Sequence, residues 1–449
     1  MAGGVRITFV GGGSVQWGPP LIADLMLTQP LAGGRLVLYD IDYPAAEQMV
    51  RLGRRIASQT RTGWEVEVQD DLDRALKGAD FVLFCIAQGG LEAFRHDLEI
   101  PARYGIAQPV GDTVGPGGIS RALRHIPVAL DVARRMEALC PGAWFINLTN
   151  PMTVITRAVE RETRIRAIGL CHELSHKRLA NLLEVPPTAI RFQAAGVNHL
   201  PWVLRMQVNG QDGFALLRNR LEAHGTHSAA RDMPDRSGVD TVFTDRAAVK
   251  LSLFQLYGYL PGAGDRHLVE FFPAFLSAQG DYGRAHGVEL TTIEHRYELL
   301  AQRRQWVARS IGQPEPLDLF LSAEQVAGVV SALAAGQRGR FIVNIPNLGQ
   351  VDNLPRQVVV ECQADLGAGG VEPISVGALP SGVVQVLAGR VWQHETIVDA
   401  AVQGDPNLVL QALLADPMVH SWETARALLD AFLSAHASHL PQFSGRDGL

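Results

Sequence analysis

Apolar residues before residue 190 gather into short continuous runs, and amphipathic stretches of helical length separate these runs. A continuous apolar run is typical of a strand that is buried on both faces of a parallel sheet. The runs that we predict as strands are 5–10, 35–40, 80–87, 143–148 and 166–171. The stretches that we predict as helices are 44–60, 119–139 and 173–184. Strands alternating with helices predict a Rossmann-like, doubly wound parallel sheet of the α/β class.

The pattern changes after residue 190 to mixed strands, a polar region near 219–240 and long helices. A chain of 449 residues is also too long for one core of usual size. We therefore predict a Rossmann-like domain over 1–190 and a mixed α+β domain over 191–449. The apolar helical stretch at 406–419 fits either the core of the second domain or a subunit interface.

The composition narrows the class of protein. Hydrophobic residues make up 47% and charged residues 19%, which is ordinary for a globular enzyme. A net charge of −6 argues against a broad surface for nucleic acid or anionic membrane, and no apolar run is long enough to span a bilayer. Four scattered cysteines are too few for a disulfide framework, and the N-terminus reads as a strand, so we expect a reducing cytoplasm.

The first predicted strand leads into a glycine-rich turn in ITFVGGGSVQWGP (7–19). Its glycines allow a tight turn and a close approach of backbone N–H groups to a pyrophosphate at the start of the next helix. Asp40, at the end of the second strand, is placed to accept hydrogen bonds from a ribose. Gln16 stands where a third glycine is usual, and an ordinary glycine turn is the alternative. The residues that we assign to NAD binding here are Gly11, Gly12, Gly13, Ser14 and Asp40.

Four later segments place polar residues at or near the predicted carboxyl edge of the sheet, where ligands bind in such folds. They are PVGDTVGPGG (109–118), NLTNP (147–151), CHE (171–173) and GVNHL (196–200). Asp112 has the plainer interpretation of a turn aspartate, and Asn147 and Asn150 that of residues that satisfy loop backbone. Together, however, the segments predict a site.

Cys171 and His199 suggest a metal, because a thiolate and an imidazole suit a divalent transition ion. Two protein ligands are fewer than the three that catalytic zinc sites usually hold, so substrate oxygens would have to complete the coordination shell. The alternative is that Cys171 simply fills the core.

In order along the chain, these segments resemble the NAD-dependent glycoside hydrolases of family 4. The resemblance continues in PGAGDRHLVEFFP (261–273), VNIPNLGQVDNLP (343–355) and GALPSGV (377–383), so it covers essentially the whole chain. This family is similar also in placing a bulky residue where Gln16 stands. Within it, the likeness is nearest to the bacterial α-galacturonidase branch.

The resemblance implies a redox-assisted elimination in place of direct displacement at C1. NAD⁺ would take hydride from C3 of the sugar, which makes the C2 proton acidic. A base would remove that proton, the C1 leaving group would depart, water would add, and the hydride would return. A divalent ion, usually Mn²⁺, would polarise the oxygens on C2 and C3.

The resemblance also implies residue roles. Cys171 and His199 would hold the metal, Asn150 and Asn198 would bind sugar hydroxyls, and Asn147 would contact the cofactor. Asp112 is the candidate acid at C1, provided that its surroundings raise its pKa.

Two further roles stay open among the resembling segments. Asp265 is the candidate C2 base, with Tyr257 and Tyr259 as rivals, because some branches use a tyrosine. His172 would bind substrate, relay a proton, or merely orient the metal ligand.

An acidic sugar needs a cation for its carboxylate, and Arg95, Arg266 and His267 are available in or near these segments. Each arginine has the alternative of a structural ion pair. The resemblance favours an α-galacturonide, while a sulfoquinovoside, an α-glucuronide and an α-galactoside remain alternatives.

Two other classes of function are also open. The fold prediction, with a Rossmann-like half followed by an α+β half, equally fits a dehydrogenase of the malate/lactate type, which would accumulate NADH. A non-enzymatic NAD-binding sensor would leave Asp112, Asn150 and Asp265 without a role. Family likeness implies a homodimer or homotetramer that acts on a small-molecule glycoside.

Overall fold

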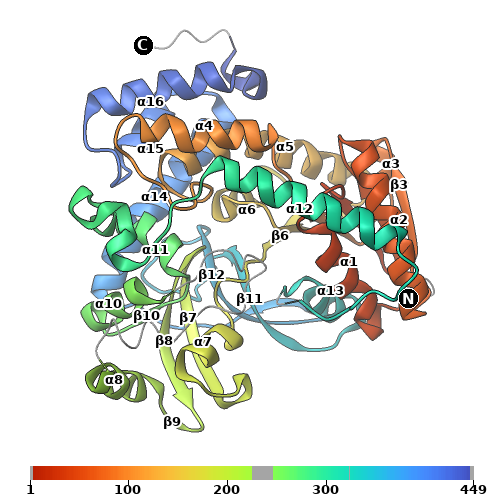
Figure 1. Cartoon of the computed structure of the whole chain (residues 1–449), viewed down its shortest axis with the longest axis horizontal. Helices are drawn as coiled ribbons and strands as arrows, with labels where there is room; N and C mark the ends of the chain where they lie inside the picture. Colours follow the sequence, from red (N-terminus) through yellow and green to blue (C-terminus); the bar gives the residue numbers. More distant parts are fainter. Residues whose placement is uncertain (1–3, 225–245, 323, 445–449) are drawn as a thin grey trace.

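One thirteen-stranded sheet forms the centre of the molecule, and helices cover its faces (Figure 1). The computed structural model describes residues 4–224, 246–322 and 324–444. The sheet runs in the order β10-β8-β7-β12-β11-β6-β5-β4-β1-β2-β3, with β13 paired to β12 and β9 paired to β8. The predicted polar region near 219–240 lies largely outside the described residues.

The six N-terminal strands are parallel, and their order β3-β2-β1-β4-β5-β6 is that of a doubly wound Rossmann sheet. This confirms the fold class and all five predicted strands. We did not predict β3, because it alternates polar and apolar residues at the sheet edge. The strands are β1 (Arg6–Val10), β2 (Arg35–Tyr39), β3 (Glu65–Gln69), β4 (Phe81–Phe84), β5 (Trp144–Asn147) and β6 (Arg166–Gly169).

The helices of this half connect successive strands, and most begin or end at recognisable signals. The side chain of Asp42 accepts a hydrogen bond from the backbone of Ala45 and so caps α2, and Pro44 lies in the first turn. The helices are α1 (Gly18–Leu27), α2 (Tyr43–Thr60), α3 (Leu72–Leu76), α4 (Gly90–Ala102), α5 (Gly115–Leu139), α6 (Met152–Glu162) and α7 (His176–Leu183).

The second half extends the same sheet with antiparallel strands. Asn344 of β11 pairs with Gly169 of β6, which joins the two halves edge to edge. The two predicted domains therefore share one sheet, and a division at residue 190 stays a prediction. The strands are β7 (Ile190–Val197), β8 (Leu200–Val208), β9 (Gln211–Asp212), β10 (Leu260–Pro261), β11 (Gly339–Pro346), β12 (Val359–Gly367) and β13 (Gly370–Pro373).

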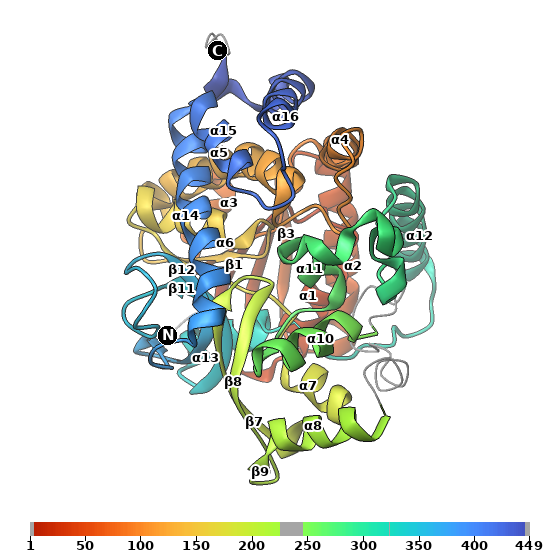
Figure 2. The same ribbon diagram turned by 90° about the vertical axis from the view of Figure 1, so that its left-hand side faces the viewer.

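The C-terminal helices pack back onto the first half, as the blue layer above α4 and α5 shows (Figures 1 and 2). Val409, Leu410 and Leu413 are buried within the chain, so the stretch 406–419 belongs to the core. None of the described helices is long and apolar enough to cross a membrane. The helices are α8 (Gly213–His224), α10 (Ala248–Tyr257), α11 (Asp265–Phe271), α12 (Ile293–Gly312), α13 (Val326–Ala335), α14 (Ser381–Gln403), α15 (Pro406–Leu414) and α16 (Trp422–Ala435).

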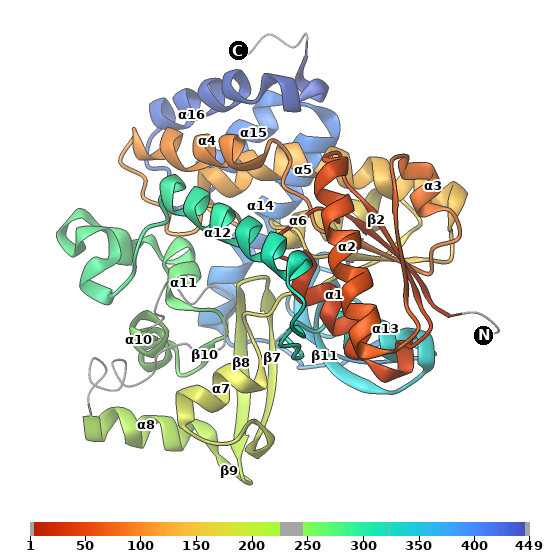
Figure 3. The same cartoon turned by 45° about the vertical axis from the view of Figure 1, so that its right-hand side comes forward.

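Helix α12 crosses the front of the molecule between α2 and α4 (Figure 3). Of its twenty residues only Ile293, Val307 and Ser310 are buried. The side chain of Gln59 on α2 bonds both the N–H and the C=O of Leu317, just beyond α12. Helix α12 is therefore anchored just beyond its C-terminal end, and most of its side chains are not buried, so its inner face can line a ligand site.

Candidate active site

A cleft of about 1300 Å³ opens at the carboxyl ends of the parallel strands. Val10, Tyr39, Cys85 and Leu148 line it at or just beyond the ends of β1, β2, β4 and β5, and α12 lines its outer side. This is the edge at which open α/β sheets bind ligands. The volume exceeds that of an ordinary small-molecule pocket, so it has room for a dinucleotide and a second ligand.

The glycine turn forms one end of the cleft. Gly11 has a φ of +86°, and a Cβ there would collide with the carbonyl of Cys85, so only glycine fits. The backbone N–H of Gly13 donates to Oδ2 of Asp40 at 2.9 Å. Ser14 accepts a hydrogen bond from the backbone of Trp17 at the start of α1. The turn therefore has the shape that phosphate binding requires.

Asp40 lies beside this turn and lines the cleft. Its Oδ1 accepts a hydrogen bond from the backbone of Asp42 at 2.9 Å, which fixes the carboxylate. Burial raises the pKa of Asp40, while these backbone hydrogen bonds oppose the rise. Gly12 lies behind the turn, where a Cβ would crowd Leu38. Gln16 also lines the cleft, so its side chain does not obstruct helix packing.

The opposite end of the cleft brings together residues from three of the predicted segments. Thr113 Oγ1 donates to Asp112 at 2.7 Å and lies 3.0 Å from Nδ1 of His199. Asn150 Nδ2 lies 3.4 Å from both carboxylate oxygens of Asp112. The structure thus places Asp112, Asn150 and His199 on one polar wall, as the shared sheet edge predicts.

The pKa of Asp112 departs from the condition that we set for an acid. Burial raises it, but the charges of Arg121, His199 and His267 and the hydrogen bond from Thr113 outweigh burial and lower the pKa. Asp112 is therefore ionised in the free cleft. The condition is therefore not met in the free cleft, because the charge of Arg121 lowers the pKa of this carboxylate.

Cys171 and His199 fit a divalent metal in their chemistry. Burial lowers the pKa of His199 to about 3, so its imidazole is neutral and keeps a lone pair for a metal. Because Nδ1 faces Thr113, Nε2 is the nitrogen left for coordination. Burial raises the pKa of the Cys171 thiol well above its usual value, so a metal's charge would be needed to deprotonate it. In the described part of the chain no three His, Cys, Asp or Glu side chains form a metal-binding group.

Glu173 of the CHE segment has contacts that we did not predict. It accepts two hydrogen bonds from Arg178, at 3.2 and 3.1 Å, and one from the backbone of Gly264 at 2.8 Å. His267 Nε2 lies 3.7 Å from the same carboxylate. Burial raises the pKa of Glu173, but Arg178 and the neighbouring histidines lower it well below its usual range. Glu173 therefore anchors the floor of the cleft as a fixed negative charge.

His172 also points to a partner that lies far away in the sequence. Its Nδ1 lies 3.1 Å from Oε1 of Glu324, and its ring lies 5.8 Å from that of Trp17. Burial lowers the pKa of His172, but Glu324 and Glu173 together raise it by more than burial lowers it, so the net shift is upward. His172 lines the cleft and is held as a candidate proton-carrying group.

Five predicted ligand-binding residues lie outside the lining of the cleft: Gly12, Asn147, Cys171, Asn198 and Arg95. Asn147 is fully buried and bonds the backbone of Thr149 and of Met152, so it secures the NLTNP turn and does not contact the cofactor site. Asn198 is buried and hydrogen-bonds the predicted metal ligand Cys171, and it does not line the cleft. Arg95 is engaged on the outer face of α4 by Glu92, Glu99 and Glu294.

The base candidates also have structural partners. Asp265 lines the cleft, but its carboxylate accepts the backbone N–H groups of Val249 and Lys250 at the start of α10. Tyr257 packs against Trp202 and Phe272 outside the lining of the cleft. Tyr259 packs edge-on against Phe214. Neither tyrosine lines the cleft.

Arg266 is committed to neighbouring loops. It donates to the carbonyl oxygens of Pro109 and Glu289 and to the hydroxyl of Thr291. His267 lines the cleft, and its ring lies 3.8 Å from that of His199. Among the three predicted cations, His267 is therefore the one that faces the polar wall and is not bonded to loop carbonyl groups as Arg266 is.

Glu361 of β12 supports this wall from behind, and no motif pointed to it. Its Oε2 accepts a 3.1 Å hydrogen bond from Asn198, and its carboxylate also bonds the backbone of His199 and the side chain of Asn344. Full burial raises the pKa of Glu361 to about 7. An unusual buried Glu in VVVEC was the only available signal.

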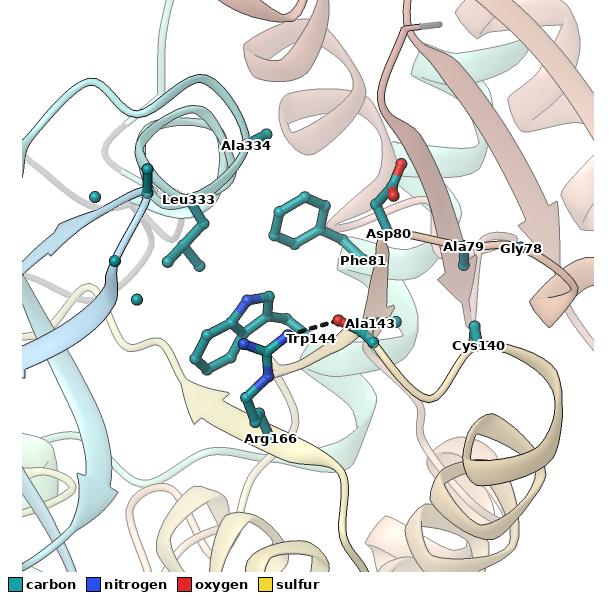
Figure 4. Close-up of a pocket in the computed structure, with 15 residues that line it drawn as sticks. Gly78, Ala79, Asp80, Phe81, Cys140, Ala143, Trp144, Arg166, Leu333 and Ala334 are labelled. Atoms are coloured by element: carbon teal, nitrogen blue, oxygen red, sulfur yellow. Dashed lines mark hydrogen bonds between the residues drawn. The ribbon is translucent and has the colours of Figure 1, made fainter. Parts of the chain in front are cut away.

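A second cavity, of about 380 Å³, lies at the opposite, amino-terminal edge of the sheet (Figure 4). The Arg166 guanidinium lies 4.2 Å from the ring centre of Trp144 and donates to the carbonyl of Gly142. Asp80 accepts the backbone N–H of Arg6. Arg166 and Asp80 are each bonded to a separate backbone group, so they do not converge on a ligand as the polar groups of the cleft do.

Fold and cleft together define an α/β enzyme of the dinucleotide-binding class. Residues 6–185 match the family model of the family 4 glycosyl hydrolases, and residues 194–419 match the model of their C-terminal domain. The chain belongs to the family 4 glycosyl hydrolases, and it is a glycosidase. This sets aside the dehydrogenase and sensor alternatives.

Individual members of the family are similar to this chain over almost its whole length. An α-galacturonidase of Bacillus subtilis is 36% identical over 425 residues, which cover 92% of this chain and 93% of that protein. The crystal structure of lplD from Bacillus subtilis, described as a glucosidase, superposes with a TM-score of 0.88 at 35% identity, covering 96% of this chain and 100% of that one. A 6-phospho-α-glucosidase from gut microorganisms, solved with NAD and Mn²⁺, is similar in fold, with a TM-score of 0.80 at 24% identity over 98% and 99% of the chains.

Proposed function

We propose that this chain hydrolyses α-galacturonides with NAD⁺ and a divalent metal, with Mn²⁺ as the first candidate. The observation that carries the proposal is that Asp40 and His199 line one cleft, Asp40 at the glycine turn and His199 beside Asp112 and Asn150. The α-galacturonidase of Bacillus subtilis supports the substrate, and the NAD- and Mn²⁺-bound relative supports the cofactors.

The cofactors would supply hydride acceptance at C3 and polarisation of the oxygens on C2 and C3. Gly11, Gly13 and Ser14 form the turn that would let the backbone approach the pyrophosphate, and Asp40 would accept from the ribose hydroxyls. Cys171 and His199 would hold the metal. Asn198 would orient the cysteine through its hydrogen bond to the thiol.

Two carboxylates would handle protons at the sugar. Asp112 remains our candidate for assistance at C1, and bound substrate would have to exclude water and raise the pKa of Asp112 before it donates. Asp265 remains our candidate C2 base. Asn150 would bind a sugar hydroxyl beside Asp112, and His172, held by Glu324, would relay the proton out of the cleft.

The test is p-nitrophenol release from aryl α- and β-glycosides: galacturonide, glucuronide, galactoside and sulfoquinovoside. Each is assayed with and without NAD⁺, Mn²⁺ and a reducing agent. The proposal predicts fastest release from the α-galacturonide, dependence on both NAD⁺ and metal, and no accumulation of NADH. Release from the galacturonide that is equally fast without NAD⁺ would contradict the mechanism, and a clear preference for another sugar would replace the substrate with one of the alternatives.

Two further predictions concern the protein as a whole. We propose a homodimer or homotetramer in the cytoplasm, from family likeness and from the four free, buried cysteines. Light scattering coupled to size-exclusion chromatography measures the oligomer directly.

A further inference from the structure

Arg121 is one of four arginines of the cleft that the sequence did not single out. Arg121 lies on α5 and lines the cleft, and its Nε donates to the backbone carbonyl of Asn150 at 2.9 Å. Among the described residues, its Nη1 and Nη2 have no hydrogen-bond partner and its guanidinium forms no salt bridge. Because Nε is occupied, the edge that carries Nη1 and Nη2 is the one open to a ligand.

The other arginines of the cleft are differently placed. Arg178 is bound by both oxygens of Glu173, and Arg266 is bound by the loop carbonyl groups that surround it. Arg304 is exposed on α12, the helix that contacts α2 and α4. Among the described residues, Arg121 is thus an arginine of the cleft whose Nη1 and Nη2 are not engaged.

The surroundings of Arg121 favour an anionic ligand. Its guanidinium lies 5.8 Å from the ring centre of Phe94, and that of Arg296, from α12, lies 6.0 Å from the same ring. Two cations therefore converge on one aromatic side chain that lines the cleft. Burial lowers the pKa of Arg121, while Asp112 raises it, so this desolvated cation gains from a further negative charge.

We propose that Arg121 is the specificity-determining residue that binds the acidic group of the sugar, with Nη1 and Nη2 donating to two oxygens of its carboxylate. The inference rests on the proposed function and deepens it by naming the group that distinguishes an acidic from a neutral glycoside. A guanidinium edge matches the two oxygens of a carboxylate, and Asn150 and Phe94 hold the fork in one orientation. A sulfonate offers the same chemistry.

The test compares wild type, Arg121→Gln and Arg121→Lys, loaded with NAD⁺ and Mn²⁺, on aryl α-galacturonide, α-galactoside and α-sulfoquinovoside. We expect Arg121→Gln to raise the KM for the galacturonide by about 10- to 100-fold, the range for a hydrogen bond to a charged group. Arg121→Lys recovers part of this loss, because the charge remains and the fork is lost. KM for the neutral galactoside stays within about 2-fold, as for a contact that the galactoside does not make. Arg340→Gln, at an exposed arginine of β11 that pairs with Asp365 outside the cleft, is the matched control and leaves all three values unchanged.

Binding of free galacturonate, measured by calorimetry, gives a readout that needs no turnover. We expect about 10-fold or greater weakening in Arg121→Gln, with galactose binding unchanged. Equal losses on acidic and neutral sugars would overturn the proposal and leave Arg121 as a charge partner of Asp112. A sulfoquinovoside that alone responds to the variants would assign the same residue to a sulfonate. If wild type hydrolyses no acidic glycoside, the proposed function fails, and unchanged galacturonate binding in Arg121→Gln would then sink the Arg121 assignment separately.

Discussion

Glu361 of β12 accepts a 3.1 Å hydrogen bond from the side chain of Asn198, across 163 residues of sequence. The same carboxylate bonds the backbone of His199, which is held at a φ of +64°. A non-glycine residue in this region is strained, so the surrounding bonds must hold it there. Glu361 therefore fixes the turn that carries one proposed metal ligand and braces the other through Asn198.

The first prediction concerns metal affinity. Glu361→Ala removes the support of Asn198 and His199, and we expect the Kd for Mn²⁺ to rise by about 10- to 100-fold, as for other residues that orient ligands. Calorimetry on the NAD⁺-bound protein measures it. Glu372→Ala, at an exposed glutamate of β13, is the matched control and should leave the Kd unchanged. A folded Glu361→Ala protein with wild-type Mn²⁺ affinity would refute the role.

The second prediction separates two roles of Asp265. Because α10 begins without a side-chain cap of its own, the Asp265 carboxylate supplies that cap from α11. Asp265→Ala should lower the free energy of unfolding by about 1–2 kcal/mol, the usual cost of a lost cap. Asp265→Asn should keep more of this stability, NAD⁺ and Mn²⁺ affinities close to wild type, and lose hydrolysis. Near-full activity of Asp265→Asn would rule out the base role.

The third prediction follows from Glu270, which is fully buried on α11. Its Oε1 accepts the backbone N–H groups of Val110 and Gly111, which fixes the loop that carries Asp112. Burial raises the pKa of Glu270 to about 8. The folded state therefore holds this proton more tightly than the unfolded chain, so stability falls as pH rises from about 4.5 to about 8.

Thermal unfolding of Glu270→Gln tests whether stability falls as the pH rises. The amide mimics the protonated acid, so the variant should match wild type near pH 5 and become the more stable protein as the pH approaches 9. A difference in Tm that does not change with pH would show that Glu270 does not titrate in this window. The test requires no cofactor, so it stands apart from catalysis.

The fourth prediction concerns the dinucleotide. Asp40→Ala removes the carboxylate beside the glycine turn, and we expect NAD⁺ affinity to fall by about 10- to 100-fold, the range for a charged hydrogen bond. Affinity for NADP⁺ should fall less, because Asp40 disfavours its 2′-phosphate. Fluorescence titration with both dinucleotides measures this. An unchanged ratio of the two affinities would place the ribose elsewhere in the cleft.

The strongest sequence signals came from residues whose role is local. Continuous apolar runs identified β1, β2, β4, β5 and β6, because burial on both faces leaves no polar position. Gly11 and Gly13 were identifiable because only glycine permits their turn. Residues at the ends of parallel strands, such as Asp112 and Asn150, converge because the strands share one edge. Strand β3 was not predicted, because an edge strand keeps one polar face and so lacks a continuous apolar run.

The sequence did not predict which side chains would contact each other when they lie far apart along the chain. Nothing local shows that Arg95 meets three glutamates, that Asn147 turns inward, or that Tyr257 packs on Trp202. Arg121 went unnoticed because it reads as one charge on an amphipathic helix, and its value depends on what α4 and α12 bring beside it. The pKa of Asp112 likewise depends on that neighbour.

The most direct test of the account is hydrolysis of the α-galacturonide in D₂O, with NAD⁺ and Mn²⁺ present, followed by proton NMR of the released sugar. Removal of the C2 proton by a base in an open cleft and its replacement from solvent would place deuterium at C2, and the account predicts this incorporation during turnover. Product that keeps its C2 proton throughout complete hydrolysis would show that the bond breaks by direct displacement, and would contradict the roles given to Asp265, Cys171 and His199.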